Sequence, residues 1–568
     1  MDRKTVLGIG AVVLLLCFAT LCIVGIGGYI YRDQVLAWLG LAPAQQVANM
    51  LPAETDFYLS VTPNIQNVPG YQNLKRLYFD NPEIQALLDE FEAEMSNEAG
   101  ITYEADIRPW LGTELVMAAP DFSQAIQAQS NFNATPPAFV IATQTINKEA
   151  SDQFIAKVLA EAAEDQEPFT DQLYQDVTLH LQQNQDSNER FVLATFNNFV
   201  VFSTSESMVK GMIDKSKGDE TPSLADTDRF KKITGQLPAN AVLTFYMELA
   251  GIFEAALAES AVELPASQVQ DLEAFEGIGM AGTLQSDGIQ LDVVASYNIE
   301  KMSEAMRASL KRPASPNAIL ADIPAEALFV MNGYNLKLVW DSLKQSLESN
   351  PDFSEQMRDM EQELGFSVEE DIFSWMTGEY AVVLLETTPP DEFSFPLGGY
   401  TLIGASDINQ ARSHVEKIVN SLVEGEGLPL EPQTIQGIEM KGLAGPDGQF
   451  QGGYGFYKDY FLLAYQEDAV KALNSAGQNS LSSSANFKAV QSHLPASNYG
   501  YFYTDLDQLQ RLAEGQLSDF EREDYETNVR PFIEPVHAFG AATSTVGVEQ
   551  GLSKGVFFIL ISEPMAQK

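Results

Sequence analysis

The chain has 568 residues, of which 45% are apolar and 10% aromatic, so it is too long for one hydrophobic core and too apolar to be disordered throughout. Acidic residues outnumber basic ones 79 to 33, which gives a formal net charge of −46. Such a surface repels phosphate backbones and anionic headgroups, and this argues against binding to nucleic acid or to the surface of an anionic membrane.

The N-terminal segment from residue 5 to residue 31 contains no charged side chain. A helix of that length reaches about 40 Å, more than the roughly 30 Å hydrocarbon core of a bilayer. Arg3 and Lys4 precede it, and positive flanks stay in the cytoplasm. We therefore predict a transmembrane helix at 5–31, a cytoplasmic N-terminus at 1–4 and an extracytoplasmic remainder. A cleaved signal peptide is the alternative, although its apolar region usually spans only about 7–15 residues.

Cysteine and histidine are too sparse for the common metal and thiol sites. Cys17 and Cys22 both lie inside the apolar segment, so the rest of the chain has no disulfide, thiolate zinc site or cysteine nucleophile. The histidines are far apart in the sequence and none has HxxxH spacing: His180, His414, His493 and His537. We accordingly expect neither a metal centre nor a cofactor.

Two helices with the same start and the same apolar spacing are predicted in the exported region. NPEIQALLDEFEAEM begins at Asn81, and NPDFSEQMRDMEQEL begins at Asn350. In each, asparagine suits the N-cap, proline suits the first helical position, and the apolar residues recur on one helix face. Gly100 and Gly365 follow where a helix-terminating glycine is expected.

The block that follows each helix has a similar sequence in the two places. It reads GITYEADIRPWLGTEL over residues 100–115 and GFSVEEDIFSWMTGEY over residues 365–380. Thr102 and Ser367 are placed to cap a short helix whose first turn carries acids, where the helix dipole favours them. A strand is predicted to follow each short helix.

Trp110 and Trp375 occupy the same place in these two blocks. We interpret them as core side chains that pack the short helix onto the sheet, because large aromatic residues dominate core burial. A folding requirement applies to both copies, whereas a single active site need not. The alternative is an aromatic stacking surface for a sugar or a peptide.

Other segments recur in the same order along the chain. They are the strands after LPA at Leu51 and IPA at Ile323, the strand–helix units from Phe139 and Tyr400, the hairpins turning at Asn197-Asn198 and Lys458-Asp459, and the segments from Arg229 and Asn486. Chance matches would not stay collinear, so this pattern indicates an internal duplication.

We place the first repeat at 51–298, a linker at 299–321 and the second repeat at 322–562. A juxtamembrane stalk at 32–50 precedes them, and a C-terminal tail at 563–568 follows. Within each repeat, alternating strand patterns are joined by short turns and mixed with helices. This predicts the α+β class: an N-terminal transmembrane helix followed by two tandem homologous α+β modules with mainly antiparallel sheets.

The Pro-Ala strand opening, the EADIRPWLGTEL block and the single N-terminal apolar segment resemble the bacterial family known as domain of unknown function 3352. The resemblance spans most of the exported region. It implies a bacterial envelope protein with no assigned activity, so it supplies no functional residues. The second copy departs from the block, because Gly378 falls one place later than Gly112.

Two short matches to catalytic motifs are interpreted as structural. GIGMAG at Gly277–Gly282 fits GxGxxG, but a strand pattern follows it where a dinucleotide site requires a helix. SMVK at Ser207–Lys210 fits the SxxK pair of penicillin-recognising enzymes, but no KTG element occurs and a capped surface helix explains it. We predict no catalytic, cofactor-binding or metal-binding residues.

We expect a membrane-anchored extracytoplasmic protein that is not an enzyme and that serves as a binding or scaffolding module of the bacterial envelope. Its partner would be an envelope protein. Two alternatives stay open: a carrier or sensor that shelters an apolar ligand between its sheets and helices, and an acid-pair hydrolase of envelope polymers. An apolar cavity of several hundred Å³ would favour the first, and two carboxyls about 5–10 Å apart in a cleft would favour the second.

Overall fold

A computed structural model gives the fold of most of the exported region. It describes residues 46–563 except 67, 83–84, 86–101, 121, 123–137, 165–167, 184–189, 254–265, 312–313, 335, 337–339, 342–343, 345–350, 390–395, 427–429, 446–447 and 546–547. The predicted cytoplasmic N-terminus, transmembrane helix, most of the stalk and most of the C-terminal tail lie outside the described residues. Of the helices that can be described, none is both long and apolar enough to cross a membrane.

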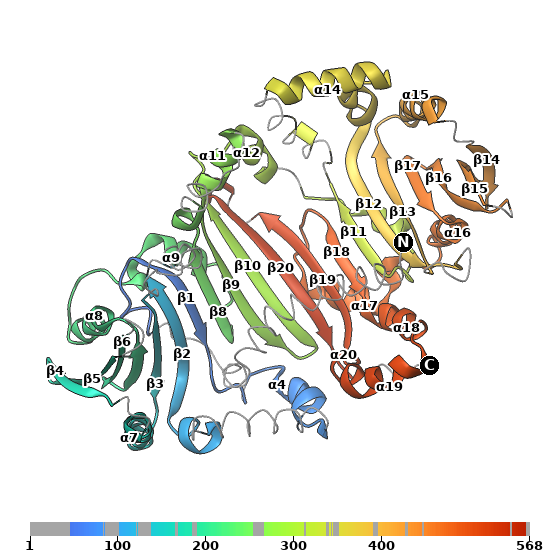
Figure 1. Ribbon diagram of the computed structural model, residues 1–568. Helices are drawn as coiled ribbons and strands as arrows, with labels where there is room; N and C mark the ends of the chain where they lie inside the picture. The colour runs from blue at the N-terminus through green and yellow to red at the C-terminus, as the bar shows by residue number, and fades with distance from the viewer. Residues whose placement is uncertain are drawn as a thin grey trace. The chain divides into compact units, whose positions relative to one another are not determined.

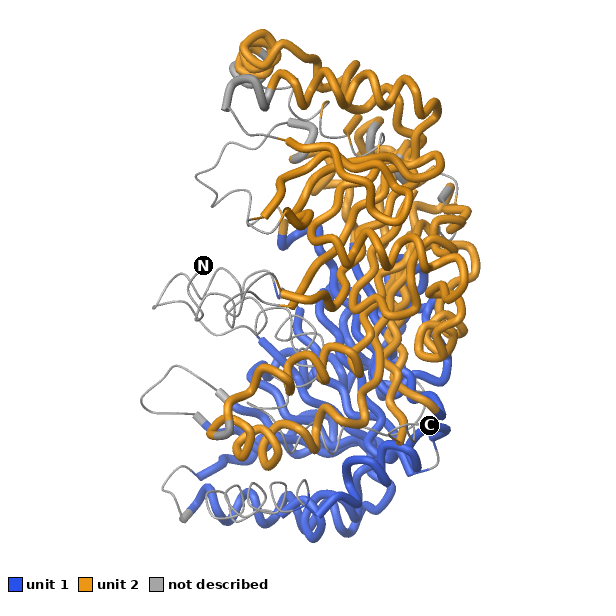
Figure 2. Tube along the Cα trace, turned by 90° about the vertical axis from the view of Figure 1, so that its right-hand side faces the viewer, with its two compact units in different colours: residues 1–252, 277–286 blue, residues 253–276, 287–568 orange. Residues whose placement is uncertain are grey.

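The chain divides into two compact units, drawn in different colours in Figure 2. Unit 1 comprises residues 1–252 and 277–286, and unit 2 comprises residues 253–276 and 287–568. The division differs from the predicted repeats, because part of the first repeat packs with unit 2. Repeats describe correspondence in sequence whereas units describe packing, so the repeat boundaries stay a prediction.

Unit 1 is built on an antiparallel sheet in the order β9-β8-β1-β2-β3-β7-β6-β5-β4 (Figure 1). Its strands are β1 (Thr55–Val61), β2 (Leu111–Pro120), β3 (Val140–Thr145), β4 (Thr170–Tyr174), β5 (Val177–Gln183), β6 (Arg190–Phe196), β7 (Phe199–Ser203), β8 (Leu243–Glu248) and β9 (Phe275–Gln285).

Unit 2 is built on an antiparallel sheet in the order β10-β20-β19-β18-β11-β12-β13-β17-β16-β15-β14. Its strands are β10 (Gly288–Tyr297), β11 (Phe329–Gly333), β12 (Met376–Glu386), β13 (Leu397–Ala405), β14 (Glu431–Ile435), β15 (Ile438–Ala444), β16 (Phe450–Tyr457), β17 (Tyr460–Tyr465), β18 (Tyr501–Asp505), β19 (Val536–Thr545) and β20 (Leu552–Ile561).

The strand order from β19 to β14 in unit 2 is the order from β9 to β4 in unit 1, strand for strand. Helices are interspersed with these strands along the chain. The predicted mixture of helix and strand with mainly antiparallel sheet is therefore confirmed.

The described helices range from single turns to 19 residues. In unit 1 they are α4 (Tyr71–Leu74), η1 (Lys75–Phe79), η2 (Tyr103–Ile107), α7 (Lys148–Glu164), α8 (Glu206–Ser216), η3 (Leu224–Asp226) and α9 (Asp228–Thr234). In unit 2 they are α11 (Ala266–Ala274), α12 (Glu304–Leu310), η4 (Ala318–Asp322), α14 (Pro351–Leu364), η5 (Val368–Phe373), α15 (Ile408–Glu426), α16 (Glu467–Ser475), η6 (Leu481–Ser483), α17 (Ala485–His493), α18 (Leu506–Glu514), α19 (Asp519–Asn528), α20 (Arg530–Ile533) and η7 (Val548–Gln550).

The helix predicted from Asn350 is present as α14, whereas most of the helix predicted from Asn81 lies outside the described residues. Both predicted hairpins are confirmed. Asn197 and Asn198 connect β6 to β7 with φ of 45° and 64°, the left-handed values that a two-residue hairpin turn of this hand requires. Lys458, with φ of 51°, begins the matching turn between β16 and β17.

The core of unit 2 lies on one face of its sheet, under α16 and α17 (Figure 1). Opposite residues of neighbouring strands point to the same face, and on this face the side chains of Val330, Val383, Leu402 and Leu462 are fully buried. Gly540 lies on the same face, where the Val490 side chain of α17 would clash with a Cβ.

Two segments predicted to connect parts of the chain contain buried side chains. At the C-terminal end of the predicted stalk, Val47 and Ala48 are fully buried in unit 1. The predicted linker region contains α12 and most of η4, and Met302 and Ile319 are 1% and 0% exposed. In both segments apolar side chains are buried before a strand begins, β1 in unit 1 and β11 in unit 2.

Candidate functional site

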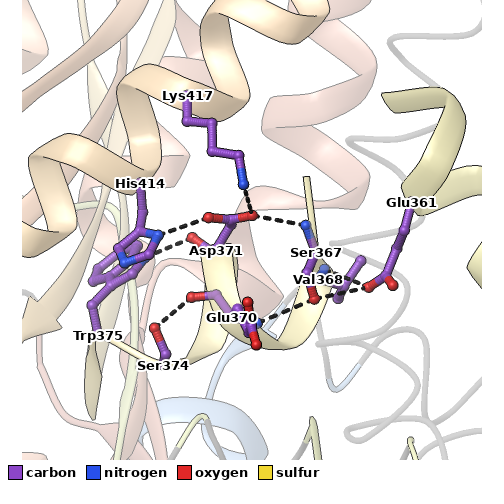
Figure 3. A network of polar contacts seen from close by, with 9 residues as sticks. All are labelled: Glu361, Ser367, Val368, Glu370, Asp371, Ser374, Trp375, His414 and Lys417. Atoms are coloured by element: carbon purple, nitrogen blue, oxygen red, sulfur yellow. Dashed lines mark hydrogen bonds and ion pairs between the residues drawn. The ribbon is translucent and has the colours of Figure 1, made fainter. Parts of the chain in front are cut away.

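Asp371 is a centre of polar contacts in the repeated block of unit 2 (Figure 3). Its Oδ2 accepts hydrogen bonds from the Ser367 backbone N–H at 2.8 Å and from the Lys417 ammonium group at 2.6 Å. Its Oδ1 lies 2.8 Å from Nδ1 of His414. Its backbone carbonyl accepts a hydrogen bond from Nε1 of Trp375 at 3.0 Å. One residue thus joins both ends of η5 to helix α15.

Unit 1 holds the same arrangement around Asp106. The Oδ2 of Asp106 accepts hydrogen bonds from the Thr102 N–H at 2.7 Å and from Lys157 at 2.8 Å. Its carbonyl accepts a hydrogen bond from Nε1 of Trp110 at 2.6 Å. Phe154 takes the place of the histidine, and its ring centre lies 5.1 Å from that of Trp110. The shared contacts indicate that the fold needs them, whereas the histidine belongs to unit 2 alone.

The electrostatics of the two carboxylates follow from these partners. Desolvation of the Asp371 carboxyl favours its protonated form, but the hydrogen bonds from Lys417 and from the Ser367 N–H outweigh this effect and lower its pKa to about 2. The hydrogen bond from Lys157 comes first among the contacts that lower the pKa of Asp106. Both groups are therefore ionised at neutral pH and act as fixed acceptors, which makes them unsuitable as general acids.

The predicted caps are half right. The Ser367 hydroxyl accepts a hydrogen bond from the Glu370 N–H at 3.4 Å, as expected for an N-cap. Thr102 makes no such side-chain cap, and Asp106 instead reaches back to the Thr102 N–H. The short helices are also π-helical turns.

The two tryptophans are buried, with Trp110 4% and Trp375 2% exposed. Each belongs to a small core between the π-helical turn, the following helix and the sheet. Interpretation as core side chains is confirmed, and the alternative of an aromatic stacking surface is wrong because neither ring is accessible to a sugar or peptide.

A buried glutamate in each unit holds the segment that precedes one strand, β1 in unit 1 and β11 in unit 2. The carboxylate of Glu114 accepts hydrogen bonds from the Val47 N–H at 3.2 Å and from the Tyr58 hydroxyl at 2.9 Å. Glu379 occupies the same place in the second block and accepts a hydrogen bond from the Ile319 N–H at 3.2 Å. Burial raises the pKa of Glu114, although these hydrogen bonds oppose the rise.

The two motif matches lie in the predicted secondary structure, a strand and a capped helix. Gly277–Gly282 lies within strand β9, with no helix directly after it. Lys210 is ion-paired with Glu206 at 2.6 Å in helix α8, whose N-cap Ser205 accepts a hydrogen bond from the Met208 N–H. Within the described part of the chain, no group of three or more His, Cys, Asp or Glu side chains is placed to hold a metal ion.

A half-open cleft of about 290 Å³ lies in unit 2 between α15 and the strands β14, β15 and β16. Charged and aromatic side chains line it together, so it is not the apolar cavity that a sheltering carrier requires. Glu416 and Glu439 both line the cleft, but the carboxyls whose pKa is raised by burial, Glu114 and Asp505, lie in the cores.

The second face of the unit 2 sheet is apolar and half-exposed where α15 and η5 do not cover it. We call this surface the open face; its side chains are Phe329, Met331, Val382, Leu384, Leu463, Tyr465, Phe502, Phe539 and Phe557. Four of them are between 37% and 56% exposed: Met331, Leu384, Leu463 and Tyr465.

Four phenylalanine rings run across neighbouring strands of the open face. The ring centres of Phe329 and Phe502 are 5.0 Å apart, those of Phe502 and Phe539 are 5.8 Å apart, and those of Phe539 and Phe557 are 6.3 Å apart. The charged residue Glu386 follows Leu384 on the same face of β12, is exposed, and borders the open face. A continuous apolar surface of this kind is a common mark of a binding site.

Unit 1 has a corresponding apolar face whose side chains are partly buried. It is formed by Phe57, Leu59, Met117, Ile141, Phe191, Phe202, Phe245 and Met280. Phe57 and Phe245 are 5.7 Å apart between ring centres and occupy the strand positions of the first pair of rings in unit 2. The apolar face is therefore a property of both units.

The family model described as Protein of unknown function (DUF3352) matches residues 9–560. The chain belongs to this family. The resemblance noted from the repeated block is thereby confirmed, and it extends over nearly the whole chain. No curated protein matches this DUF3352 chain.

Crystal structures of TP0453 are similar to part of this DUF3352 chain. Crystal form III is 12% identical, covers 47% of this chain and 85% of its own, and has a TM-score of 0.24. Crystal form IV is 13% identical, covers 44% and 79%, and has a TM-score of 0.23. At such scores the likeness carries no argument about this protein.

Sequence reasoning missed the residues that hold each repeated block of this DUF3352 protein in place. Asp106 and Asp371, like Glu114 and Glu379, have equal offsets in the two blocks, and this would have marked them. Their partners could not be found in that way because Lys157 and Lys417 approach from another helix.

Proposed function

We propose that this protein is a non-catalytic binding protein held in the cytoplasmic membrane by residues 5–31, with its two units outside the cytoplasm, and that the open face binds an acyl chain. The open face itself is the observation that carries the proposal. Side chains that would be buried in a folded protein stay half-exposed there, and covering them with a ligand removes apolar area from water.

The chemistry of the surface favours a hydrocarbon partner. The chain carries a net charge of −46, yet the nine side chains of the open face are uncharged and Glu386 lies at their border. A protein partner of ordinary composition would bring charges that this face cannot pair, whereas an acyl chain brings none. The anionic headgroup would stay outside the face, since the acidic surroundings repel it.

The predicted anchor would keep the open face near a supply of lipid. Residues 32–45 span at most about 50 Å even when fully extended, so the start of unit 1 would lie within that distance of the membrane. This part of the proposal rests on the uncharged length of residues 5–31 and on Arg3 and Lys4 before them.

We also infer that the two units descend from one duplicated module. The shared strand order supports this, and so do single hydrogen bonds outside the ladders. Leu224 N–H donates to the Leu51 carbonyl at 3.0 Å, and Leu481 N–H donates to the Ile323 carbonyl at 2.7 Å. Each bond joins the Pro-Ala opening of one unit to the same later turn, so the duplication would give the protein two apolar faces.

Photo-crosslinking in intact cells tests the proposal. A photoreactive p-benzoylphenylalanine replaces Leu463 or Met331 on the open face, or Phe520 as a control. Phe520 is 91% exposed on α19 and lies outside the open face. We expect lipid adducts, identified by mass spectrometry, at the first two positions and not at the third.

Crosslinks to one protein at Leu463 and Met331 would instead support the scaffolding function and would contradict the acyl-chain proposal. Equal lipid labelling at Phe520 would show that proximity to the bilayer, and not the open face, produces the adducts.

A further inference from the structure

The cleft beside α15 contains a cation with no acidic partner. Arg412 lies with its guanidinium 4.4 Å from the centre of the Phe456 ring. Among the residues that the structure describes, no carboxylate forms an ion pair with it, although acids outnumber bases 79 to 33 in this chain. A guanidinium stacked on a ring keeps its N–H edge free, in the plane in which carboxylates bind.

The rest of the lining limits which anion fits. Lys441 is 3.6 Å from Glu416 and is therefore already partnered, and Glu439 adds a second negative charge to the cleft. The two cations and two glutamates of the lining give no net charge, so Arg412, which forms no ion pair, is the group that a carboxylate can approach, and a dianion would meet more repulsion from the glutamates than a monoanion. The buried Tyr454 beside Phe456 supplies an apolar wall for the body of the ligand.

Unit 1 shows that the fold does not require this arginine. Counting from the equivalent residues Phe154 and His414, Asp152 is the unit 1 counterpart of Arg412, and it is ion-paired with Lys148 at 2.7 Å. Thr195 similarly stands where Phe456 does, counting from the matching hairpin turns. Arg412 and Phe456 therefore occur together in unit 2, and neither an arginine nor a phenylalanine occupies the equivalent positions of unit 1.

From these observations we infer that the cleft of unit 2 binds a small organic monocarboxylate with an apolar or aromatic body. Arg412 pairs with the carboxylate, and Phe456 and Tyr454 contact the body. The volume of about 290 Å³ suits a ligand of that size and excludes a folded partner. The inference does not depend on what binds the open face.

The test measures binding of phenylacetate to the full-length protein in neutral phosphatidylcholine nanodiscs by isothermal titration calorimetry. We expect saturable binding with a dissociation constant in about the millimolar range, as befits so small a ligand. Phenylacetamide, which lacks the charge, and phenyl phosphate, which carries more, should both bind more weakly. Arg412→Gln should weaken phenylacetate binding about tenfold or more, and Arg412→Lys should restore part of it.

Asp152→Asn is the matched control, since it alters the equivalent position of unit 1 and should leave phenylacetate binding unchanged. Near-UV circular dichroism of Arg412→Gln checks that an exposed substitution has not disturbed the fold. The inference is overturned if phenylacetate does not saturate, if phenylacetamide binds as well, or if Arg412→Gln binds like the unaltered protein.

Discussion

Asp371 concentrates its contacts on a side chain that is only 5% exposed, whereas the Asp106 side chain of unit 1 is 18% exposed and lacks a histidine partner. A carboxylate held by an ammonium group and a backbone N–H is stabilised as the ion, and the protein gains from this only while the group is ionised. Protonation in acid should therefore destabilise unit 2 at Asp371 more than it destabilises unit 1 at Asp106.

Asp371→Asn should lower the free energy of unfolding by about 2 kcal/mol at pH 7, because the pKa falls from 3.8 to about 2 on folding. The carboxyl has a lower pKa in the folded than in the unfolded chain, so its contribution is complete above pH 4 to 5 and is lost between about pH 4 and pH 2. Urea unfolding at a series of pH values should show the variant and the unaltered protein converging in acid. Asp106→Asn, the control, should show a smaller difference; a gap independent of pH would contradict the assignment.

Glu114→Ala should destabilise unit 1 by at least about 3 kcal/mol, because it leaves the Val47 N–H and the Tyr58 hydroxyl buried without an acceptor. Glu379→Ala should cost less in unit 2. Glu114→Gln keeps an acceptor and should cost less than alanine. Burial raises the pKa of Glu114 in the folded protein. The difference in free energy of unfolding between the unaltered protein and Glu114→Gln should therefore become smaller as the pH rises above about 4.5. Thermal unfolding of the unaltered protein and of Glu114→Gln at pH 5 and pH 8 measures this difference. A larger difference at pH 8 than at pH 5 would contradict the prediction.

At the scale of elements, each π-helical turn is held on its sheet by one tryptophan. Trp375 packs edge-on against Phe461 with 5.8 Å between ring centres, and its N–H binds the carbonyl of Asp371. The ring fills the space between η5, α15 and the sheet. A further ring contact of the turn is that of Phe373, which stacks on Trp340 with 4.6 Å between ring centres.

Trp375→Ala should lower the free energy of unfolding by about 3–5 kcal/mol, the usual cost of a cavity of this size. Trp375→Phe keeps most of the apolar contact but loses the N–H, so it should cost less. Hydrogen exchange of residues 368–373 reports the effect directly, with faster exchange in the alanine variant. Unchanged exchange there would mean that the turn does not depend on the ring.

At the scale of the whole molecule, the predicted anchor sets where both units work. Alkaline phosphatase fused to the C-terminus should be active in a bacterial host, and green fluorescent protein exported through the same secretion route should stay dark, because the units are predicted to lie outside the cytoplasm. Removing residues 1–31 and supplying a cleavable signal peptide should release the protein from the membrane fraction. A fluorescent C-terminal fusion would place the units in the cytosol and would remove the basis for an envelope function.

Much of the architecture could be read from the order of the residues alone. The collinear blocks, the hairpins at Asn197 and Lys458 and the alternating strands depend on local spacing, turn chemistry and side-chain periodicity, which a linear chain records directly. The same information indicated the resemblance to the family and predicted that the two tryptophans are core residues.

Only the tertiary structure decided which distant groups meet. Asp371 and Lys417 share a hydrogen bond because α15 crosses η5, and Arg412 faces Phe456 because the strands after α15 turn back beside it. The open face likewise exists because α15 and η5 cover only part of that side of the sheet, and the strand sequences do not show how far a helix will extend over them. Contacts between segments that are far apart in the chain depend on how helices and strands pack in three dimensions, and the local spacing of residues does not determine that packing.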